Sequence, residues 1–172
     1  MDLRKNILTA LLLSIGFILH SIIPGVLTGM KFDLLLSLIF VSIIVNKDLK
    51  NTIVAALLGG FLSAISTTFP GGQIPNMLDK IVTCFVIYLI VKYLKVNNHF
   101  LSAIVGFVGT LVSGGVFLYS AKIIVGLPAP FSVLFTSIVI PTAITNAIVT
   151  LFVYKAVASA IKISKSNFVQ IK

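Results

Sequence analysis

The sequence predicts an all-α integral membrane protein, built as a bundle of six transmembrane helices. Hydrophobic residues make up 58% of the chain and charged residues only 10%, and the mean hydropathy of +1.16 lies far outside the range of soluble globular proteins. Six apolar segments approach the roughly 20 residues that a helix needs to cross a bilayer. They lie at about residues 7–23, 30–45, 52–68, 77–95, 100–125 and 132–161, so that residues 1–172 form a single transmembrane domain.

The distribution of basic residues predicts that both termini are cytoplasmic. The apolar part of the second segment, Asp33 to Val45, would rise only about 20 Å as a helix and could also be re-entrant or interfacial. With six crossings, however, all but three of the 13 Lys and Arg residues fall on the inner side, as the positive-inside rule requires. The three outer residues are Lys31, Lys80 and Lys122. Without the second helix, every later loop would lie on the opposite side of the membrane, against the positive-inside rule.

Charge and residue content exclude several classes of function. The net charge of +9 is spread over cytoplasmic helix ends and reports topology, so nucleic-acid binding is not expected. The chain has no Glu, its only acids are Asp2, Asp33, Asp48 and Asp79, and Cys84 is its single cysteine. No nucleophile stands beside a base, no metal-ligand spacing occurs and no phosphate-binding loop is present. The sequence therefore predicts a protein with no catalytic residues, metal or cofactor.

The first apolar segment carries small residues at a spacing that suits close helix contact. Ala10 and Ser14 lie four residues apart on one face, and Gly16 follows. This face could contact another protein or another helix of the same bundle. His20, near the outer end, is interpreted as a capped or interfacial histidine rather than as a ligand-binding residue.

The connection before the second segment combines turn residues with charge. Pro24-Gly25 and Gly29 predict a flap that ends at Lys31 and Asp33. The flap could contact a ligand. Alternatively, Asp33 stabilises the positive end of the next helix and Lys31 binds lipid headgroups.

Small residues also form stripes on the third and fifth segments. Gly59, Gly60 and Ser63 share one side of the third, and Gly106 and Gly109 share one side of the fifth. Such stripes favour close helix packing. Further along the fifth segment, Ser113 and Gly114 are weaker candidates for lining a pocket.

Residues 69–80 form the most polar segment of the chain, and they precede the fourth helix. Pro70-Gly71-Gly72 predicts a turn, and Pro75 favours an extended approach that makes Asn76 the N-cap of a helix starting near Met77. Asp79 would then complete a capping box. That interpretation does not explain Lys80, because a cation is unfavourable in the first turn. We therefore expect this segment to contact a ligand in a water-accessible cavity.

The sixth segment combines a proline with polar side chains at helical spacing. Pro141 is expected to kink the helix, and Thr142, Asn146 and Thr150 follow at steps of four residues on one face. Asn146 could bond a neighbouring helix or line the cavity.

Several of these motifs together resemble one known family. Phe69-Pro-Gly-Gly-Gln-Ile-Pro-Asn76 with Asp79-Lys80 is the most specific of them, and the motifs around Pro24, Gly109 and Pro128 occur in the same order. In this respect the chain is similar to the bacterial tryptophan transporter family of TrpP type. That family resembles the substrate-binding S components of energy-coupling factor transporters, which are six-helix proteins of the cytoplasmic membrane.

The resemblance implies high-affinity capture of tryptophan and its uptake with a transmembrane coupling (T) component and two cytoplasmic ATPases. In S components a small-xxx-small pattern contacts the coupling protein, and Ala10 and Ser14 occupy that position, with Ser14 departing from the commoner Ala. Membrane lipid is the remaining expected partner. A solitary ion-coupled secondary transporter and a membrane assembly protein without transport activity are the alternatives.

The candidate site must bind an ammonium, a carboxylate and an indole. We expect Asp79 or Asp33 to bind the ammonium, and the flap to close over the ligand with Met30 and Phe32. Candidates for the carboxylate are Lys80, Asn76 and the Gly71-Gly72 amides, and candidates for the indole N–H are Gln73 and Asn146. The complete set of candidate substrate-binding residues is Lys31, Asp33, Gly71, Gly72, Gln73, Asn76, Asp79, Lys80 and Asn146.

Overall fold

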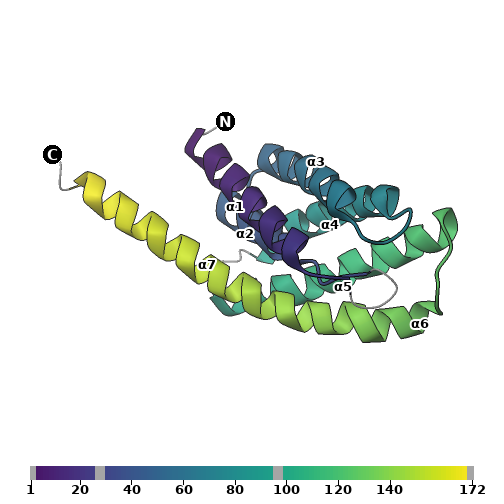
Figure 1. Ribbon diagram of the computed structural model, residues 1–172. Coiled ribbons are helices and arrows are strands. Elements are labelled where there is room, and N and C mark those ends of the chain that lie inside the picture. The colour runs from purple at the N-terminus through teal and green to yellow at the C-terminus, as the bar shows by residue number, and fades with distance from the viewer. Residues whose placement is uncertain (1–2, 26–29, 95–98, 170–172) are drawn as a thin grey trace.

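The computed structural model describes residues 3–25, 30–94 and 99–169, which fold into a bundle of helices (Figure 1). Five helical segments in this part of the chain are long and apolar enough to cross a membrane, and a sixth is shorter. The all-helical membrane bundle is therefore confirmed. In order, the elements are α1 (Leu3–Ile22), α2 (Leu34–Asn46), α3 (Leu49–Ser66), α4 (Gln73–Leu94), α5 (His99–Ile124), α6 (Phe131–Leu134), the π-helical turn η1 (Phe135–Val139) and α7 (Ile140–Val169).

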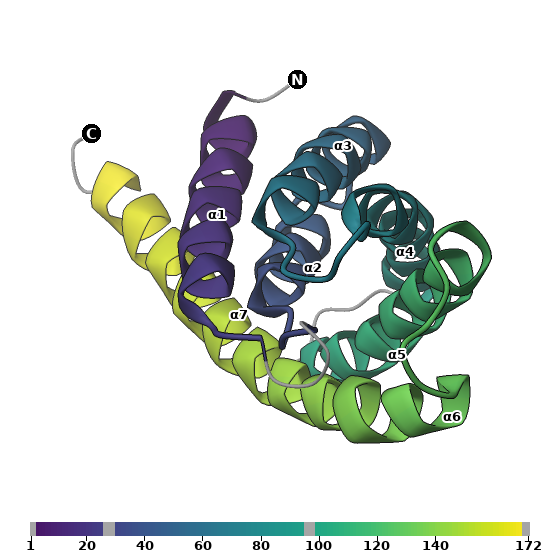
Figure 2. The same ribbon diagram turned by 45° about the vertical axis from the view of Figure 1, so that its right-hand side comes forward.

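The short helix α2 is the centre of the bundle rather than an interfacial segment. It contacts α1, α3, α4, α5 and α7, and it lies between them in the turned view (Figure 2). Leu35, Ile39, Phe40 and Ile43 are completely buried. Asp33 caps the helix, because its carboxylate accepts a hydrogen bond from the backbone N–H of Leu36 at 3.3 Å. The expected stabilisation of this helix end by Asp33 is therefore present.

Helix α4 begins four residues earlier than the sequence analysis predicted, and the predicted capping box is wrong. The backbone N–H of Asn76 donates to the carbonyl of Gly72 at 2.9 Å, and the Asn76 side chain donates to the same oxygen at 2.8 Å. Pro75 is tolerated because the first turn of a helix does not use its N–H groups. Asp79 consequently lies beyond the first turn, where a capping role cannot explain it.

Glycines bring α5 close to its neighbours. A Cβ atom on Gly106 would lie 2.7 Å from the backbone oxygen of Asn146, and one on Gly109 would lie 2.5 Å from the ring of Phe40. The small-residue stripe of α5 thus serves packing against α7 and α2, as the spacing indicated.

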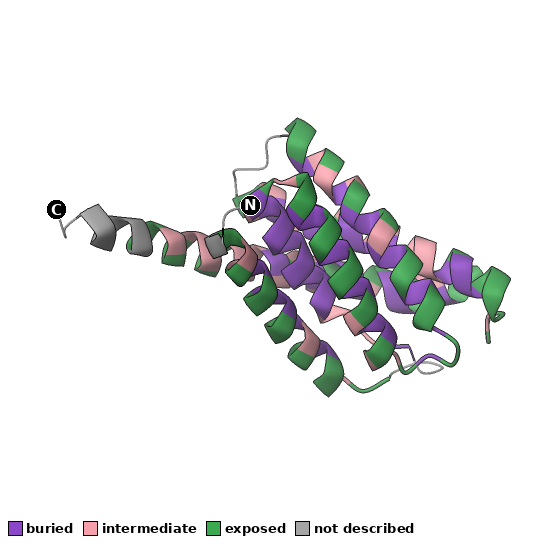
Figure 3. Ribbon diagram, turned by 90° about the horizontal axis from the view of Figure 1, so that it is seen from above, coloured by how far each residue is buried: buried purple, intermediate pink, exposed green. Residues whose placement is uncertain are grey.

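The last helix is irregular where the sequence analysis expected a kink. Elements α6, η1 and α7 follow one another directly, and the π-helical turn comes immediately before Pro141. Because Pro141 has no N–H, one regular helical hydrogen bond cannot form there. Within η1 the N–H of Ile140 reaches back five residues to the carbonyl of Phe135. The C-terminal part of α7 extends beyond the bundle (Figure 3).

The start of α1 and the end of α7 lie on the same side of the bundle (Figures 1 and 2). The end of α1, the start of α2, the end of α3 and the starts of α4 and α7 consequently lie together at the other end. By the charge distribution, this second end is predicted to face outward.

Candidate functional site

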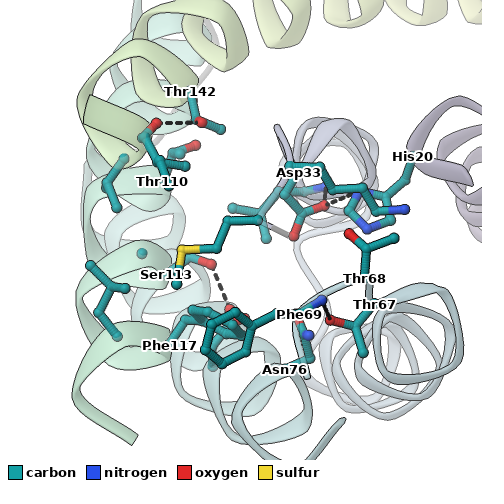
Figure 4. Close-up of a pocket in the computed structure, with 18 residues that line it drawn as sticks. His20, Asp33, Thr67, Thr68, Phe69, Asn76, Thr110, Ser113, Phe117 and Thr142 are labelled. Atoms are coloured by element: carbon teal, nitrogen blue, oxygen red, sulfur yellow. Dashed lines mark hydrogen bonds and ion pairs between the residues drawn. The ribbon is translucent and has the colours of Figure 1, made fainter. Parts of the chain in front are cut away.

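A cavity of about 90 Å³ lies at the end of the bundle opposite the termini. In Figure 4, His20, Asp33, Thr67 and Thr68 lie on one side of it, and Phe117, Ser113, Thr110 and Thr142 lie on the other. The apolar lining consists of Met30, Leu36, Phe69, Gly114, Phe117, Leu118, Ile138 and Val139. The polar lining consists of His20, Lys31, Asp33, Thr67, Thr68, Asn76, Asp79, Thr110, Ser113 and Thr142.

Four ionisable side chains form a connected cluster beside this pocket. The Lys80 ammonium lies 2.7 Å from Asp33 Oδ2 and 2.8 Å from Asp79 Oδ2. On the other side, Asp33 Oδ1 lies 3.3 Å from His20 Nδ1. The hydroxyl of Ser113 donates a hydrogen bond to Asp79 Oδ1 at 2.5 Å. Helices α1, α4 and α5 and the start of α2 are therefore joined through one polar network.

The cluster contains more negative than positive charge. Asp33 and Asp79 carry two carboxylates, Lys80 supplies one ammonium between them, and both Asp79 and Lys80 are only 1% exposed. With His20 counted as neutral, these four side chains carry a net charge of −1. A buried charge is costly unless it is paired, so this arrangement favours a ligand that brings a cation.

The two charged groups on the connection before α2 have shifted pKa values. Burial alone would raise the pKa of Asp33, but the neighbouring Lys80 ammonium is the largest of the effects that outweigh it, so the pKa lies below its ordinary value. Burial lowers the pKa of the Lys31 ammonium, and Asp33 partly offsets that shift. Lys31 lines the pocket and is partly exposed. It is thus a second, separate charge at the site.

Two phenylalanines form the aromatic part of the lining. Phe69, in the connection before α4, meets Phe117 of α5 edge to face, with ring centroids 5.6 Å apart. Met30 is buried against the same apolar cluster. Together these side chains give the pocket an apolar and partly aromatic lining, which suits contact with a planar ring.

The structure brings only part of the predicted site together. Lys31, Asp33, Asn76 and Asp79 line the pocket, while Lys80 lies behind the two carboxylates.

Other predicted site residues lie outside the pocket lining. Gly71 adopts a positive φ of 72° beside Val125, Gly72 is buried in the turn and Gln73 is exposed. Asn146 is completely buried and donates to the Asp33 carbonyl at 2.9 Å. Its predicted role as a link between helices is the one observed here.

The predicted flap is only partly described. Met30 lines the pocket, whereas Phe32 does not, and positions 26–29 lie outside the described residues.

Several residues that line the pocket or its ion cluster were not predicted from the sequence. His20 was interpreted as interfacial, but it lies in the ion cluster. Phe117 carried no distinctive signal, because aromatic side chains are common in membrane helices. Thr142 belongs to the polar stripe predicted on the sixth segment, but only Asn146 of that stripe was named as a cavity candidate. Ser113 and Gly114, the weak candidates on α5, both line the pocket.

Comparison with known proteins gives the decisive observation on family. The model of the family described as "Tryptophan transporter TrpP" matches residues 2–162. The chain belongs to this family. It is 42% identical to a probable tryptophan transport protein of Clostridium acetobutylicum, covering 95% of this chain and 96% of that protein.

Two further relatives carry the same description. One is from Clostridium perfringens, at 41% identity over 94% of this chain and 97% of that protein. The other is from Bacillus subtilis, at 38% identity over 99% and 98%. No solved structure matches the chain. As a member of the TrpP family with several membrane-length helices, the chain is a multi-pass transport protein of the cell membrane and not an enzyme.

Proposed function

We propose that this chain binds tryptophan with high affinity from the outer side of the membrane, as the substrate-binding component of an energy-coupling factor transporter. The observation that carries the proposal is the pocket, which combines a buried ion cluster that has two carboxylates and one ammonium with an apolar lining that includes two phenylalanines. A zwitterionic aromatic amino acid needs both features at one site. The family membership supports tryptophan as the ligand.

Asp79 is the proposed partner of the ligand ammonium. It lines the pocket, and each oxygen of an ionised carboxylate can accept a second hydrogen bond beside those from Lys80 and Ser113. Lys31 is the proposed partner of the ligand carboxylate. Lys80, the earlier candidate, is already held between Asp33 and Asp79 and stabilises their charges instead.

The cavity is too small to hold tryptophan as it stands. Its volume of about 90 Å³ lies below the roughly 300 Å³ at which small-molecule sites begin. Binding therefore requires the lining to move apart. Met30 is the lining residue best suited to this movement, because an unbranched methionine side chain repacks easily.

Helix α1 offers the proposed surface for the coupling component. Ala10 and Ser14 are both exposed on its outer face, while Gly16 packs against Leu35 and Leu38 of α2. The Ser14 hydroxyl donates to the Ala10 carbonyl at 2.9 Å, so it bonds within its own helix and leaves a shallow surface. Close approach of another helix, from a T component joined to two ATPases, fits such a face.

Binding can be tested by the fluorescence of the ligand, since the chain contains no Trp. We expect Asp79→Asn to weaken tryptophan binding about 10- to 100-fold, the effect of losing a charge-assisted hydrogen bond. Asp48→Asn is the matched control, because Asp48 caps α3 at the opposite end of the bundle. If Asp79→Asn reduced the free energy of tryptophan binding and the free energy of unfolding by equal amounts, a ligand role for Asp79 would be contradicted.

The buried ion cluster also supports a second candidate, a solitary transporter coupled to protons, because ionisable residues inside membrane bundles often form proton relays. Uptake into vesicles that contain only this protein separates the two. Uptake driven by a proton gradient alone would support the second candidate. Uptake that needs the coupling component, the ATPases and ATP would support the first.

A further inference from the structure

We infer that the Thr142 hydroxyl accepts a hydrogen bond from the ring N–H of the ligand, and that it thereby selects indole over rings without a donor. This inference rests on the proposed function, because it assigns one contact within the same pocket. Thr142 takes the place of Gln73 and Asn146, the two residues that were predicted to accept the indole N–H. Gln73 is exposed outside the pocket lining, and Asn146 is completely buried behind it.

The hydrogen bonding of Thr142 leaves it able only to accept. It lines the pocket and is 5% exposed, and its hydroxyl proton is donated to the Ile138 carbonyl at 2.6 Å. A hydroxyl has one proton and two lone pairs, so both lone pairs remain available. Within the described part of the chain, no donor bonds to this oxygen. An indole N–H, which can only donate, is its complement.

The neighbouring hydroxyls on the same side of the pocket are less suitable. Thr110 donates to the Gly106 carbonyl at 2.7 Å and accepts from the Asn146 amide at 3.0 Å, so a single lone pair is left. Ser113 also donates its proton, to the Asp79 carboxylate, and keeps both lone pairs, but it lies beside the ion cluster, where the ligand ammonium is proposed to bind. Thr142 is therefore the acceptor with two available lone pairs that lies away from the ion cluster.

The position of Thr142 suits the ring end of the ligand. Figure 4 places it across the pocket from Asp33 and His20, so a ligand bound through the ion cluster can extend toward it. The π-helical turn η1 presents Ile138 and Val139 to this pocket, and the first turn of α7 presents Thr142. Two of these three side chains are aliphatic. An acceptor in such surroundings loses water when the ring enters, and it is costly to leave unpaired.

The test compares L-tryptophan with 3-benzothienyl-L-alanine, in which sulfur replaces the ring N–H at nearly the same shape. Each is titrated into the purified full-length protein, with the analogue followed by its displacement of tryptophan. A neutral hydrogen bond of about 1 kcal/mol corresponds to roughly fivefold in affinity, and an unpaired acceptor adds to this. We expect wild-type protein to prefer tryptophan about 5- to 20-fold.

The variants then locate the source of that preference. Thr142→Val should weaken tryptophan binding and leave benzothienylalanine unchanged, so that the ratio falls to about one. Thr142→Ser should keep the preference. Thr145→Val is the control, because Thr145 makes the same kind of bond to its own helix, to the Pro141 carbonyl at 3.0 Å, but does not line the pocket.

Three results would overturn the inference. The first is equal affinity of the wild-type protein for the two ligands. This measurement uses only wild-type protein, so it does not depend on whether a variant folds. A second is an unchanged ratio in Thr142→Val. In either of these cases tryptophan still binds, so the proposed function stands. Failure of wild-type protein to bind either ligand overturns the proposed function, and this inference with it.

Discussion

Replacing Lys80 by methionine should destabilise the protein strongly, because Lys80 neutralises two buried carboxylates at once. Its ammonium lies 2.7 Å from Asp33 and 2.8 Å from Asp79. Methionine keeps the apolar stem and removes only the charge. Removing one partner of a buried ion pair typically costs about 3–5 kcal/mol, and here both acids lose their ammonium partner. We therefore expect the upper part of that range.

For a chain of this length, each kcal/mol corresponds to about 2–4 °C in melting temperature, so the expected loss is about 8–20 °C. Unfolding in mild detergent can be followed with a thiol-reactive dye, since Cys84 is the only cysteine and is 1% exposed. Lys92→Met is the control, because Lys92 lies on the same helix and is exposed.

Partial recovery of thermal stability in a triple variant would independently test the role of Lys80 in neutralising the two carboxylates. Adding Asp33→Asn and Asp79→Asn to Lys80→Met removes the uncompensated charges, and stability should largely return. A Lys80→Met protein that melts within about 3 °C of wild type would refute the view that these pairs are buried and coupled. So would a triple variant no more stable than Lys80→Met alone.

Two further predictions concern the helix surfaces. Ser14→Phe should leave tryptophan binding unchanged but abolish co-purification with the coupling component, and retained co-purification would argue against this face as the interface. Gly106→Ala should lower stability by about 1–3 kcal/mol, because its Cβ would meet the backbone oxygen of Asn146 at 2.7 Å. Gly115→Ala is the control: its Cβ would have only Phe135 nearby, at 3.9 Å, so thermal melting should show little loss or a small gain.

Much of the fold could be predicted from the sequence, because a membrane-spanning helix can be recognised from its length and hydropathy alone. The short α2 shows the limit of this approach. Its 13 residues left a re-entrant or interfacial segment open as an alternative, yet it contacts five neighbouring helices. Burial by neighbours depends on the tertiary arrangement, which local hydropathy does not encode. Only the charge balance of the later loops indicated that the segment crosses the membrane.

The start of α4 was missed for a local reason. Pro75 was taken to precede the helix, whereas it lies inside the first turn, where proline is equally acceptable. The error extended to Asp79, which acquired an apparent capping role. Placed correctly, Asp79 faces Ser113 from another helix, a contact between residues 34 positions apart. No local pattern could have shown it.

The lining of the pocket has one consequence for the cell. Its aromatic residues are Phe69 and Phe117, and these 172 residues contain no Trp. Their synthesis therefore needs no charged tryptophan tRNA. A cell short of tryptophan can still make them, which suits a member of a family of tryptophan transporters.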